Sequence, residues 1–327
     1  MKRLPSSTLS RSAKITFADF LKVGADRLRL SVVVGGDRLS REVERPMVNR
    51  PGLALTGFFE HFAWRRMQLF GNAEIAYLRS LPDEDRLARI RALFDHKAFC
   101  IIYTNGHKPR RDVMRLAEEA GAIVMSSALK TRELMHHSAF VMERLCAPKT
   151  SLYGTMVEVC GLGVFFEGDP GMGKSETALG LIKRGHALVA DDLTCIRKDV
   201  ANDILYGSSS ESTAGFMEIR GIGIIHVASV FGINAVRGEK QLQLVVTFKR
   251  LKDIEGEIDR VGQRRMYTNI LGVDVPHLIM PVSEGRDLVN LVETAAQQQK
   301  LIIAGQDPVG ELSERLRRRA DGALSKR

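Results

Sequence analysis

GDPGMGKS, the stretch from Gly168 to Ser175, fits the pattern G-x-x-x-x-G-K-[ST] of loops that bind nucleotide phosphates. The apolar segment Val164-Phe165-Phe166 stands directly before it, and a run of helical character, Glu176 to Arg184, follows it. Strand, loop and helix are therefore in the order that such a loop requires. We predict a phosphate-binding loop, called the P-loop below, and an α/β fold around it.

The chemistry of phosphate explains why the P-loop needs these residue types. Phosphate oxygens need several hydrogen-bond donors at close range, and glycine backbones can supply them because no Cβ obstructs the turn. The positive end of the following helix favours anions, and Lys174 can reach the β and γ phosphates as a point charge. Ser175 can offer its hydroxyl to Mg²⁺. The predicted ATP-binding residues are Gly168, Asp169, Pro170, Gly171, Met172, Gly173, Lys174 and Ser175.

Two adjacent carboxylates, Asp191 and Asp192, follow the next apolar segment, His186 to Ala190. We interpret this segment as a buried strand that brings both carboxylates to its carboxyl end, the edge where open α/β sheets bind ligands. One carboxylate could act through a metal ion while the other accepts a hydroxyl proton. The spacing allows either residue to be the base, and it is also compatible with two carboxylates that only cap the next turn.

The composition is that of an ordinary folded chain, long enough for two hydrophobic cores. The 327 residues are 44% hydrophobic and 27% charged, and the formal net charge is +9. Such a charge suits an anionic partner, such as a nucleotide or an acidic protein surface. No recognisable nucleic-acid-binding module accompanies the charge, so we expect no nucleic acid partner.

Pro148 marks the expected boundary between two domains. The helix predicted from about Thr131 to Leu145 should end near it, because proline disfavours helical conformation in the residue before it. Residues 1–148 alternate apolar runs with helical stretches, which predicts an N-terminal α/β domain. Residues 149–327 contain the P-loop and many short apolar segments, which predicts a strand-rich α/β domain with C-terminal helices.

Apolar segments and turn signals predict the individual elements of both domains. Strands are expected at residues 31–34, 99–103, 122–125, 155–159, 163–167, 187–190, 223–227 and 242–248. Helices are expected at residues 111–120, 131–145, 175–184, 288–301 and 310–319.

The four cysteines, Cys100, Cys146, Cys160 and Cys195, lie far apart in the sequence, and none forms a C-x-x-C pair. Each lies among apolar residues, so we expect buried free thiols in a reducing cytosol and no zinc site. No run approaches the roughly 18 apolar residues of a membrane span, and the N-terminus lacks the apolar core of a signal peptide. We therefore expect a cytoplasmic protein without a membrane partner.

Several segments closely resemble the HPr kinase/phosphorylase family, whose members phosphorylate a serine of the phosphocarrier protein HPr and can remove that phosphate. The resemblance covers most of the chain. It is carried by GMGKSETALGLIKRGHALVADD at Gly171–Asp192, MEIRGIGII at Met217–Ile225, Glu239-Lys240, residues 270–275 and residues 49–57. It implies a P-loop kinase domain resembling phosphoenolpyruvate carboxykinase, the use of ATP and Mg²⁺, and a homo-hexamer that acts on HPr or an HPr-like protein.

The resemblance also implies roles for individual residues. Lys174 corresponds to the phosphate-binding catalytic lysine, and Ser175 and Glu218 correspond to the Mg²⁺ ligands. Asp192 would accept the proton of the substrate serine and, in reverse, donate it when inorganic phosphate attacks phosphoserine and pyrophosphate leaves. Arg260 corresponds to the catalytic arginine of the family, and an arginine fork can neutralise charge on a transferring phosphoryl group.

Two further stretches resemble signatures of the family. The first is implicated in both reactions and comprises Met217, Glu218, Ile219, Arg220, Gly221, Ile222, Gly223, Ile224, Ile225 and His226. The second is implicated in dephosphorylation, is associated with contact to HPr, and comprises Pro281, Val282, Ser283, Glu284, Gly285 and Arg286. A tight turn without a catalytic role is the other interpretation of the second stretch.

Two positions depart from the family pattern. Tyr153-Gly154 stands where the family usually has a catalytic histidine followed by glycine. Tyrosine is a poor proton carrier at neutral pH because phenols ionise near pH 10. Ser283 and Glu284 stand where the family typically has a basic residue and a proline, so positive charge beside the phosphate site is lost. The kinase reaction is therefore predicted on a fuller set of residues than the phosphorylase reaction.

Two other functions are compatible with the P-loop. The first is a nucleotide-sensing regulator that binds ATP without transferring phosphate, which Tyr153 favours. The second is a P-loop kinase of another acceptor, such as a small metabolite, which would need no protein acceptor. Asp192, Glu218 and Arg260 favour phosphate transfer over sensing alone.

Overall fold

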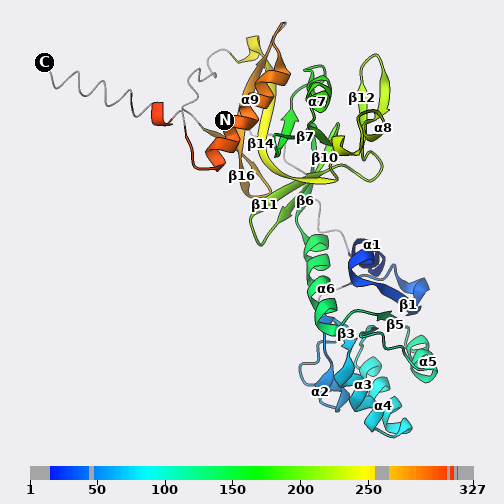
Figure 1. Cartoon of the computed structure of the whole chain (residues 1–327). Coiled ribbons are helices and arrows are strands. Elements are labelled where there is room, and N and C mark those ends of the chain that lie inside the picture. The colour runs from blue at the N-terminus through cyan, green and yellow to red at the C-terminus, as the bar shows by residue number, and fades with distance from the viewer. Residues whose placement is uncertain are drawn as a thin grey trace, which may run out of the picture. The chain divides into compact units, whose positions relative to one another are not determined.

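The structure is a computed structural model that describes residues 15–43, 48–254, 265–283, 285–307, 310–312 and 315. The chain divides into two compact units between Ala147 and Pro148, which we call the N-terminal unit and the C-terminal unit. Each is described by itself (Figure 1).

The N-terminal unit is an α/β layer structure around a five-stranded sheet of order β1-β5-β4-β3-β2. Strands β2 to β5 run parallel, and β1 pairs antiparallel with β5. Its strands are β1 Leu30–Val34, β2 Val48–Asn49, β3 Met67–Phe70, β4 Cys100–Tyr103 and β5 Ile123–Ser127. Its helices are α1 Phe17–Leu28, α2 Gly52–Leu55, α3 Asn72–Ser80, α4 Asp83–Asp95, α5 Arg111–Glu119 and α6 Thr131–Cys146, with a 3₁₀ turn at Gly36–Arg38.

Helices cover both faces of this sheet, which explains why β4 is apolar at every position. Ile101 and Tyr103 belong to a core that also contains residues of α2 to α5. Cys100 and Ile102 point to the opposite face, into a core shared with α1 and α6. All four side chains of β4 are buried.

The C-terminal unit is built on a nine-stranded sheet. Seven of its strands follow the order β6-β10-β11-β14-β8-β7-β9, and the other two are β16, which also pairs with β14, and β15, which pairs with β16. A separate hairpin joins β12 and β13. The strands are β6 Lys149–Tyr153, β7 Thr155–Val159, β8 Leu162–Glu167, β9 Ala187–Ala190, β10 Leu193–Asp199, β11 Ile204–Ser208, β12 Phe216–Ile219, β13 Gly223–His226, β14 Glu239–Arg250, β15 Met266–Ile270 and β16 Val273–Val282. The helices are α7 Lys174–Lys183, α8 Val227–Phe231 and α9 Leu288–Ile303, with 3₁₀ turns at Ile233–Ala235 and Leu251–Asp253.

Strand β8 is buried on both faces and separates two cores. Val164 and Phe166 point into a core that also contains residues of α7 and α9. Phe165 points into a second core, to which β10, β11 and β15 contribute. Because β8 lies between β7 and β14, its carboxyl end and the P-loop after it are held inside the sheet rather than at its margin.

The expected α/β class is confirmed, and the helices expected around α5, α6, α7 and α9 are present. The strand expected at 223–227 ends one residue earlier because Val227 begins α8. Most of the helix expected at 310–319 lies outside the described residues. In the part of the chain that is described, no helix is long and apolar enough to span a membrane.

The expectation of four buried thiols is wrong for three of them. Only Cys100 is buried, whereas Cys146 is exposed and Cys160 and Cys195 are half-buried. Cys100 lies within a strand that is covered on both faces. Cys160 instead occupies a two-residue turn between β7 and β8, and turns lie at the surface even when their neighbours are apolar.

Candidate active site

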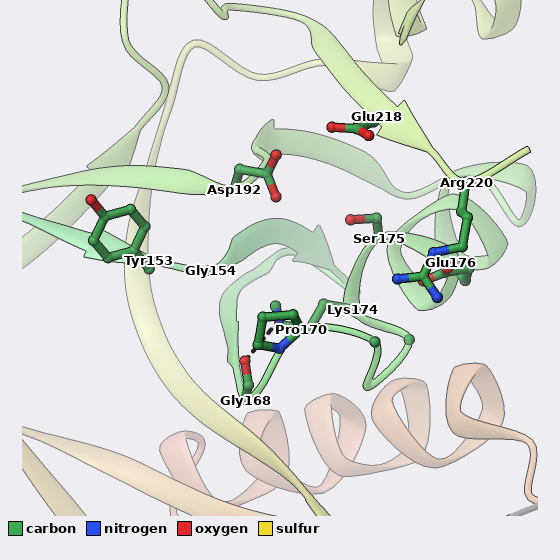
Figure 2. A pocket seen from close by; sticks show the side chains of 12 residues that line it. Tyr153, Gly154, Gly168, Pro170, Lys174, Ser175, Glu176, Asp192, Glu218 and Arg220 are labelled. Carbon is green, nitrogen blue, oxygen red and sulfur yellow. Dashed lines mark hydrogen bonds between the residues drawn. The ribbon is translucent and has the colours of Figure 1, made fainter. Parts of the chain in front are cut away.

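A pocket of about 530 Å³ opens at the carboxyl end of β8. It is bounded by the P-loop, by the segment after β9 and by the β12–β13 hairpin, as Figure 2 shows. Its lining residues are Tyr153, Gly154, Gly168, Pro170, Gly171, Gly173, Lys174, Ser175, Glu176, Asp192, Glu218 and Arg220. The structure therefore brings most of the predicted P-loop together with Asp192 and Glu218, which are distant from it in sequence.

Close packing against β14 fixes the start of the P-loop. Gly168 has a φ of 145°, and a Cβ at this position would lie 2.6 Å from the carbonyl oxygen of Phe248. Any larger residue would therefore push the loop away from its neighbouring strand. Helix α7 begins six residues later, at Lys174, so its positive end faces the pocket.

The Lys174 ammonium lies against the P-loop itself. Its Nζ donates to the carbonyl oxygen of Gly168 at 2.8 Å (Figure 2) and to that of Asp169 at 3.2 Å. Two predicted ATP-binding residues do not line the pocket. Met172 is buried in the core beneath the loop, and the exposed Asp169 is outside the lining set. The pattern therefore identified the loop, while the fold decides which of its residues face the cavity.

Asp191 is buried behind the pocket and organises its wall. Its Oδ1 accepts hydrogen bonds from Thr155 Oγ1 at 2.7 Å and from Ser175 Oγ at 3.1 Å. Its Oδ2 accepts from the backbone N–H of Glu218 at 3.2 Å. One carboxylate thus holds both Ser175 and the strand that carries Glu218. Burial raises the pKa of Asp191, and the neighbouring charge of Asp192 adds to this rise, while the hydrogen bonds oppose it.

Asp192 points in a different direction from its neighbour because the backbone turns sharply there. Its φ is 59°, a left-handed conformation that aspartate tolerates better than most residues. The N–H of Leu193 donates to the carbonyl of Asp191 at 2.7 Å, and the N–H of Gly154 donates to that of Asp192 at 2.8 Å. The side chain is exposed and lines the pocket, and Figure 2 shows its carboxylate facing the same space as the Ser175 hydroxyl.

The β12–β13 hairpin brings two charged groups to the pocket by alternation. Met217 and Ile219 are buried in the core, whereas Glu218 and Arg220 point out and line the cavity. Residues further along the predicted signature lie elsewhere. Ile222 and Ile224 are exposed, and the His226 ring bonds the Ser229 hydroxyl at 2.6 Å. The signature therefore combines core residues, two lining residues and an exposed tip.

Comparison with known proteins places both units in one family. The model described as "HPr Serine kinase N terminus" matches residues 20–141, and that described as "HPr Serine kinase C-terminal domain" matches residues 144–316. An HPr kinase/phosphorylase of Leptospira biflexa is 39% identical over 292 residues, which cover 89% of this chain and 90% of that protein. The chain belongs to the HPr serine kinase family.

A second curated relative agrees with this assignment. The HPr kinase/phosphorylase of Treponema pallidum is 38% identical over 276 residues, or 84% of this chain and 86% of that protein. A solved structure, the Hpr(Ser) kinase/phosphatase from Coxiella burnetii, is 32% identical and covers 47% of this chain and 93% of that chain, with a TM-score of 0.45. Membership of a kinase family implies that the chain uses ATP.

The structure describes only some of the remaining positions that the family resemblance singled out. Arg260 and Glu284 lie outside the described residues. Pro281 and Val282 end β16, where they pair with the end of β14, and Arg286 N–H donates to the carbonyl of Ser283 at 3.3 Å. None of the described residues of 281–286 belongs to the lining set of the pocket.

Tyr153, at the position of the usual family histidine, does line the pocket. It ends β6, it is 86% exposed, and it pairs across the sheet with Leu193, next to Asp192.

The sequence did not reveal the hydrogen bond between Thr155 and Asp191 that supports the pocket wall. Alternation between polar and apolar residues could not single out Thr155, because it begins a strand that is buried on both faces.

Proposed function

We propose that this protein transfers the γ-phosphoryl group of ATP to a serine of HPr, and that it also catalyses the reverse phosphorolysis. The observation that supports the proposal best is the convergence of Lys174, Ser175, Asp192 and Glu218 on one pocket. These residues supply a cation, oxygen ligands and a proton acceptor, which are the parts that phosphoryl transfer needs. The names of the matching relatives support HPr as the acceptor.

In the forward direction, the P-loop N–H groups and Lys174 bind the phosphates of ATP. Lys174 now donates to two loop carbonyls, and it exchanges one of these bonds for a phosphate oxygen when ATP binds. Asp192 accepts the proton of the substrate serine as its oxygen attacks the γ-phosphorus and ADP leaves. Asp191 acts as a positioning residue, because it holds Ser175 and the backbone of Glu218.

In the reverse direction, an oxygen of inorganic phosphate attacks the phosphorus of phosphoserine. The serine oxygen leaves with a proton from Asp192, and pyrophosphate forms. Asp192 recovers its proton from the P–OH group of the attacking phosphate, so phosphoserine and HPO₄²⁻ give serine and pyrophosphate with no net change in protons. Tyr153 stands beside Asp192 without the ready proton exchange of an imidazole, so we propose that the reverse reaction is the slower one.

The donor set fits a magnesium ion. Ser175 Oγ, Glu218 and Asp192 offer oxygen atoms only, which are the ligands that Mg²⁺ prefers, and all three residues line one cavity. We propose that Ser175 and Glu218 hold the ion, with Asp191 keeping the hydroxyl in place. When bound, Mg²⁺ neutralises charge on the β and γ phosphates.

The wider setting follows from the family resemblance. We propose a homo-oligomer, hexameric as the family is, that works in the cytoplasm on HPr or an HPr-like protein. A protein acceptor is compatible with the site because the pocket is open and its wall includes the projecting hairpin of Glu218 and Arg220.

Mass spectrometry of HPr incubated with the protein, Mg²⁺ and ATP tests the proposal. We expect one phosphoserine on HPr, none when ATP or Mg²⁺ is omitted, and release of pyrophosphate when phosphate is then added to the purified phosphoprotein. ATP binding without phosphoserine would refute the kinase proposal and favour a nucleotide-sensing regulator. ATP consumption that depends on a small metabolite would instead indicate another acceptor.

A further inference from the structure

Three side chains with metal-binding atoms gather beyond the end of α7 that is remote from the P-loop. Among the described residues, Cys160, His186 and Glu293 form a group whose ligating atoms all lie within 4.8 Å of one another. Cys160 lies in the turn between β7 and β8, His186 precedes β9, and Glu293 lies on α9. Helix α7 has ten residues and therefore separates this group from the pocket by about 15 Å.

The group is held in place by hydrogen bonds to both nitrogens of the His186 ring. Nδ1 accepts from the backbone N–H of Cys160 at 3.4 Å, and Nε2 lies 3.1 Å from Glu293 Oε1. These partners assign the proton to Nε2. The other oxygen of Glu293 accepts from Arg184 Nη1 at 2.9 Å. This bond to Arg184 and the contact with His186 lower the pKa of Glu293, so the carboxylate is ionised at neutral pH.

Cys160 lies in a tight backbone turn, and its side chain packs against the core that α7 and α9 cover. Its φ is 51°, Gly161 follows with a φ of 88°, and the flanking Val159 and Leu162 form the last pair of the hairpin. These angles are typical of a tight type I′ turn. Lys300, on α9, donates to the Cys160 carbonyl at 3.2 Å. The turn and α9 are thus already joined around the thiol.

We propose that Cys160, His186 and Glu293 bind a divalent transition-metal ion of the Zn²⁺ type, with water as the fourth ligand. Sulfur, imidazole nitrogen and carboxylate oxygen are the donors that Zn²⁺ accepts, and a thiolate discriminates against Mg²⁺. Partial exposure of His186 and Glu293, at 12% and 25% of their side chains, leaves a path for the ion. The site is independent of the proposed phosphoryl transfer because it shares no residue with the pocket.

Binding rearranges two protons. The Cys160 thiol releases its proton to solvent, and the imidazole proton moves from Nε2 to Nδ1, so that Nε2 can coordinate the ion. Nδ1 then gives up its long contact with the Cys160 N–H, and the bond between His186 and Glu293 is replaced by a bond from each to the metal. Metal binding therefore releases a proton, and affinity should rise with pH.

The ion would join α9 to the sheet. Val292 and Ala296, on either side of Glu293 along α9, are fully buried in the core over β8. A bond from the helix to the β7–β8 turn therefore strengthens packing that already exists. We infer a structural role for the ion and expect higher thermal stability with Zn²⁺, without participation in phosphoryl transfer.

Cobalt spectroscopy of the full-length, metal-stripped and reduced protein tests the site. Excess Mg²⁺ and ADP occupy the pocket, and Co²⁺ is then titrated in. We expect one equivalent to produce a thiolate-to-cobalt charge-transfer band, and Zn²⁺ to abolish the band by displacement. Cys160→Ser should remove the band and weaken Zn²⁺ binding more than tenfold, as should His186→Gln. Cys195→Ser, at another half-buried cysteine, is the matched control and should retain the band.

Failure to bind would leave His186 and Glu293 as a hydrogen-bonded pair only. Absence of the band in the wild-type protein would overturn the proposal, and so would equal Zn²⁺ affinity in Cys160→Ser. Melting temperature provides a second readout in case His186→Gln folds poorly. Zn²⁺ should raise it in the wild type and in Cys195→Ser but not in Cys160→Ser, and an equal rise in all three would also contradict the site.

Discussion

The two units each end parallel strands in polar loops, yet they use those polar groups in opposite ways. In the N-terminal unit, Thr104 follows β4 and is fully buried. Its hydroxyl lies 2.7 Å from the hydroxyl of Thr131, and Asn105 Nδ2 donates to both hydroxyls at 3.1 Å. The polar groups of this edge bond to one another and tie the start of α6 to the sheet.

In the C-terminal unit, the corresponding bonds lie behind the pocket wall. Asp191 is bonded by Thr155, Ser175 and the backbone of Glu218, and this network leaves Asp192 and the Glu218 carboxylate facing the cavity. The two strand ends differ in one respect. At the pocket, a buried carboxylate holds the wall in place and leaves other charged groups facing the cavity, whereas in the N-terminal unit the polar groups bond to one another. We therefore expect substitutions at the C-terminal pocket to change activity, and substitutions at the polar edge of the N-terminal sheet to change stability alone.

Removal of the Lys174 ammonium should have the largest effect on this division. We expect Lys174→Ala to lower the rate of phosphoserine formation by several hundredfold to about a thousandfold, because the charge on the transferring phosphoryl group loses a fixed cation. Initial rates on HPr would measure the loss. Lys183→Ala, at an exposed lysine of the same helix, is the control and should retain the wild-type rate. Retention of a tenth of the rate by Lys174→Ala would contradict the assignment.

Asp191→Asn tests whether the buried carboxylate organises the wall. An amide cannot accept hydrogen bonds through both of its polar atoms, so either Ser175 or the Glu218 backbone loses its partner. We expect affinity for Mg²⁺ and ATP to fall about tenfold to a hundredfold, the range typical of groups that orient metal ligands. Calorimetry would measure the affinity, with Asp199→Asn, at the half-buried end of β10, as the control. Unchanged affinity would show that Asp191 only fills space.

The same carboxylate predicts a pH dependence. Because burial raises the pKa of Asp191, the folded state binds this proton more tightly than the unfolded state does. Ionisation of Asp191 therefore costs stability at neutral pH, and this cost disappears as pH falls through the raised pKa toward the ordinary value of about 3.9. Mg²⁺ and ATP should bind more weakly over the same fall in pH. We expect this acid limb in wild-type binding curves and not in those of Asp191→Asn, and equal limbs would assign it to another group.

Tyr153 should affect the balance of the two reactions by a smaller factor. We expect Tyr153→His to raise the ratio of phosphorolysis to kinase rate by about tenfold, because an imidazole exchanges protons near neutral pH. Tyr153→Phe removes only the hydroxyl and should leave the kinase rate within about twofold of wild type. Pyrophosphate release and phosphoserine formation, assayed on the same preparations, give the ratio. A ratio unchanged in Tyr153→His would show that this position does not limit the reverse reaction.

Loss of a hydrogen bond in the network of Thr104, Asn105 and Thr131 should lower the stability of the N-terminal unit and leave the rate of phosphate transfer unaltered. Thr104→Val removes a buried hydroxyl from its network with Thr131 and Asn105, and we expect a loss of about 1–3 kcal/mol in unfolding free energy. Trp64 is the single tryptophan of the chain and reports on this unit during urea denaturation. Thr56→Val, at an exposed threonine, is the control. A fall in ATP affinity in Thr104→Val would contradict the division of roles.

The sequence alone predicted several of the elements whose side chains face one clear environment, although it missed β3, which is buried at every position. The P-loop, α7 and β9 were predicted because a motif and a fully buried strand mark them directly. Strands β10 and β11 were not predicted, because their positions alternate between buried and half-buried and the apolar pattern is correspondingly weak. The α/β class survived these omissions because the strongest signals lie in the central strands.

The candidate site was predictable from spacing alone only in the P-loop, where the residues that bind phosphate are contiguous in the sequence. The separation of Asp191 from Asp192 depends on a backbone turn with positive φ, which the spacing of two adjacent aspartates cannot reveal. The group of Cys160, His186 and Glu293 is assembled from a turn, a strand start and a distant helix, so no local spacing announces it. In both cases tertiary packing creates the arrangement.

The rate of phosphoserine formation by Asp192→Asn tests the central claim most directly. Full-length wild type, Asp192→Asn and Thr104→Val would be assayed side by side on HPr, together with their affinity for ATP. We predict that Asp192→Asn binds ATP normally and transfers phosphate at least about a hundredfold more slowly in both directions, because the serine oxygen loses its proton acceptor in the forward reaction and its proton donor in the reverse one. Thr104→Val should match the wild type in both properties. Phosphate transfer by Asp192→Asn at close to the wild-type rate would contradict the assignment of the catalytic base.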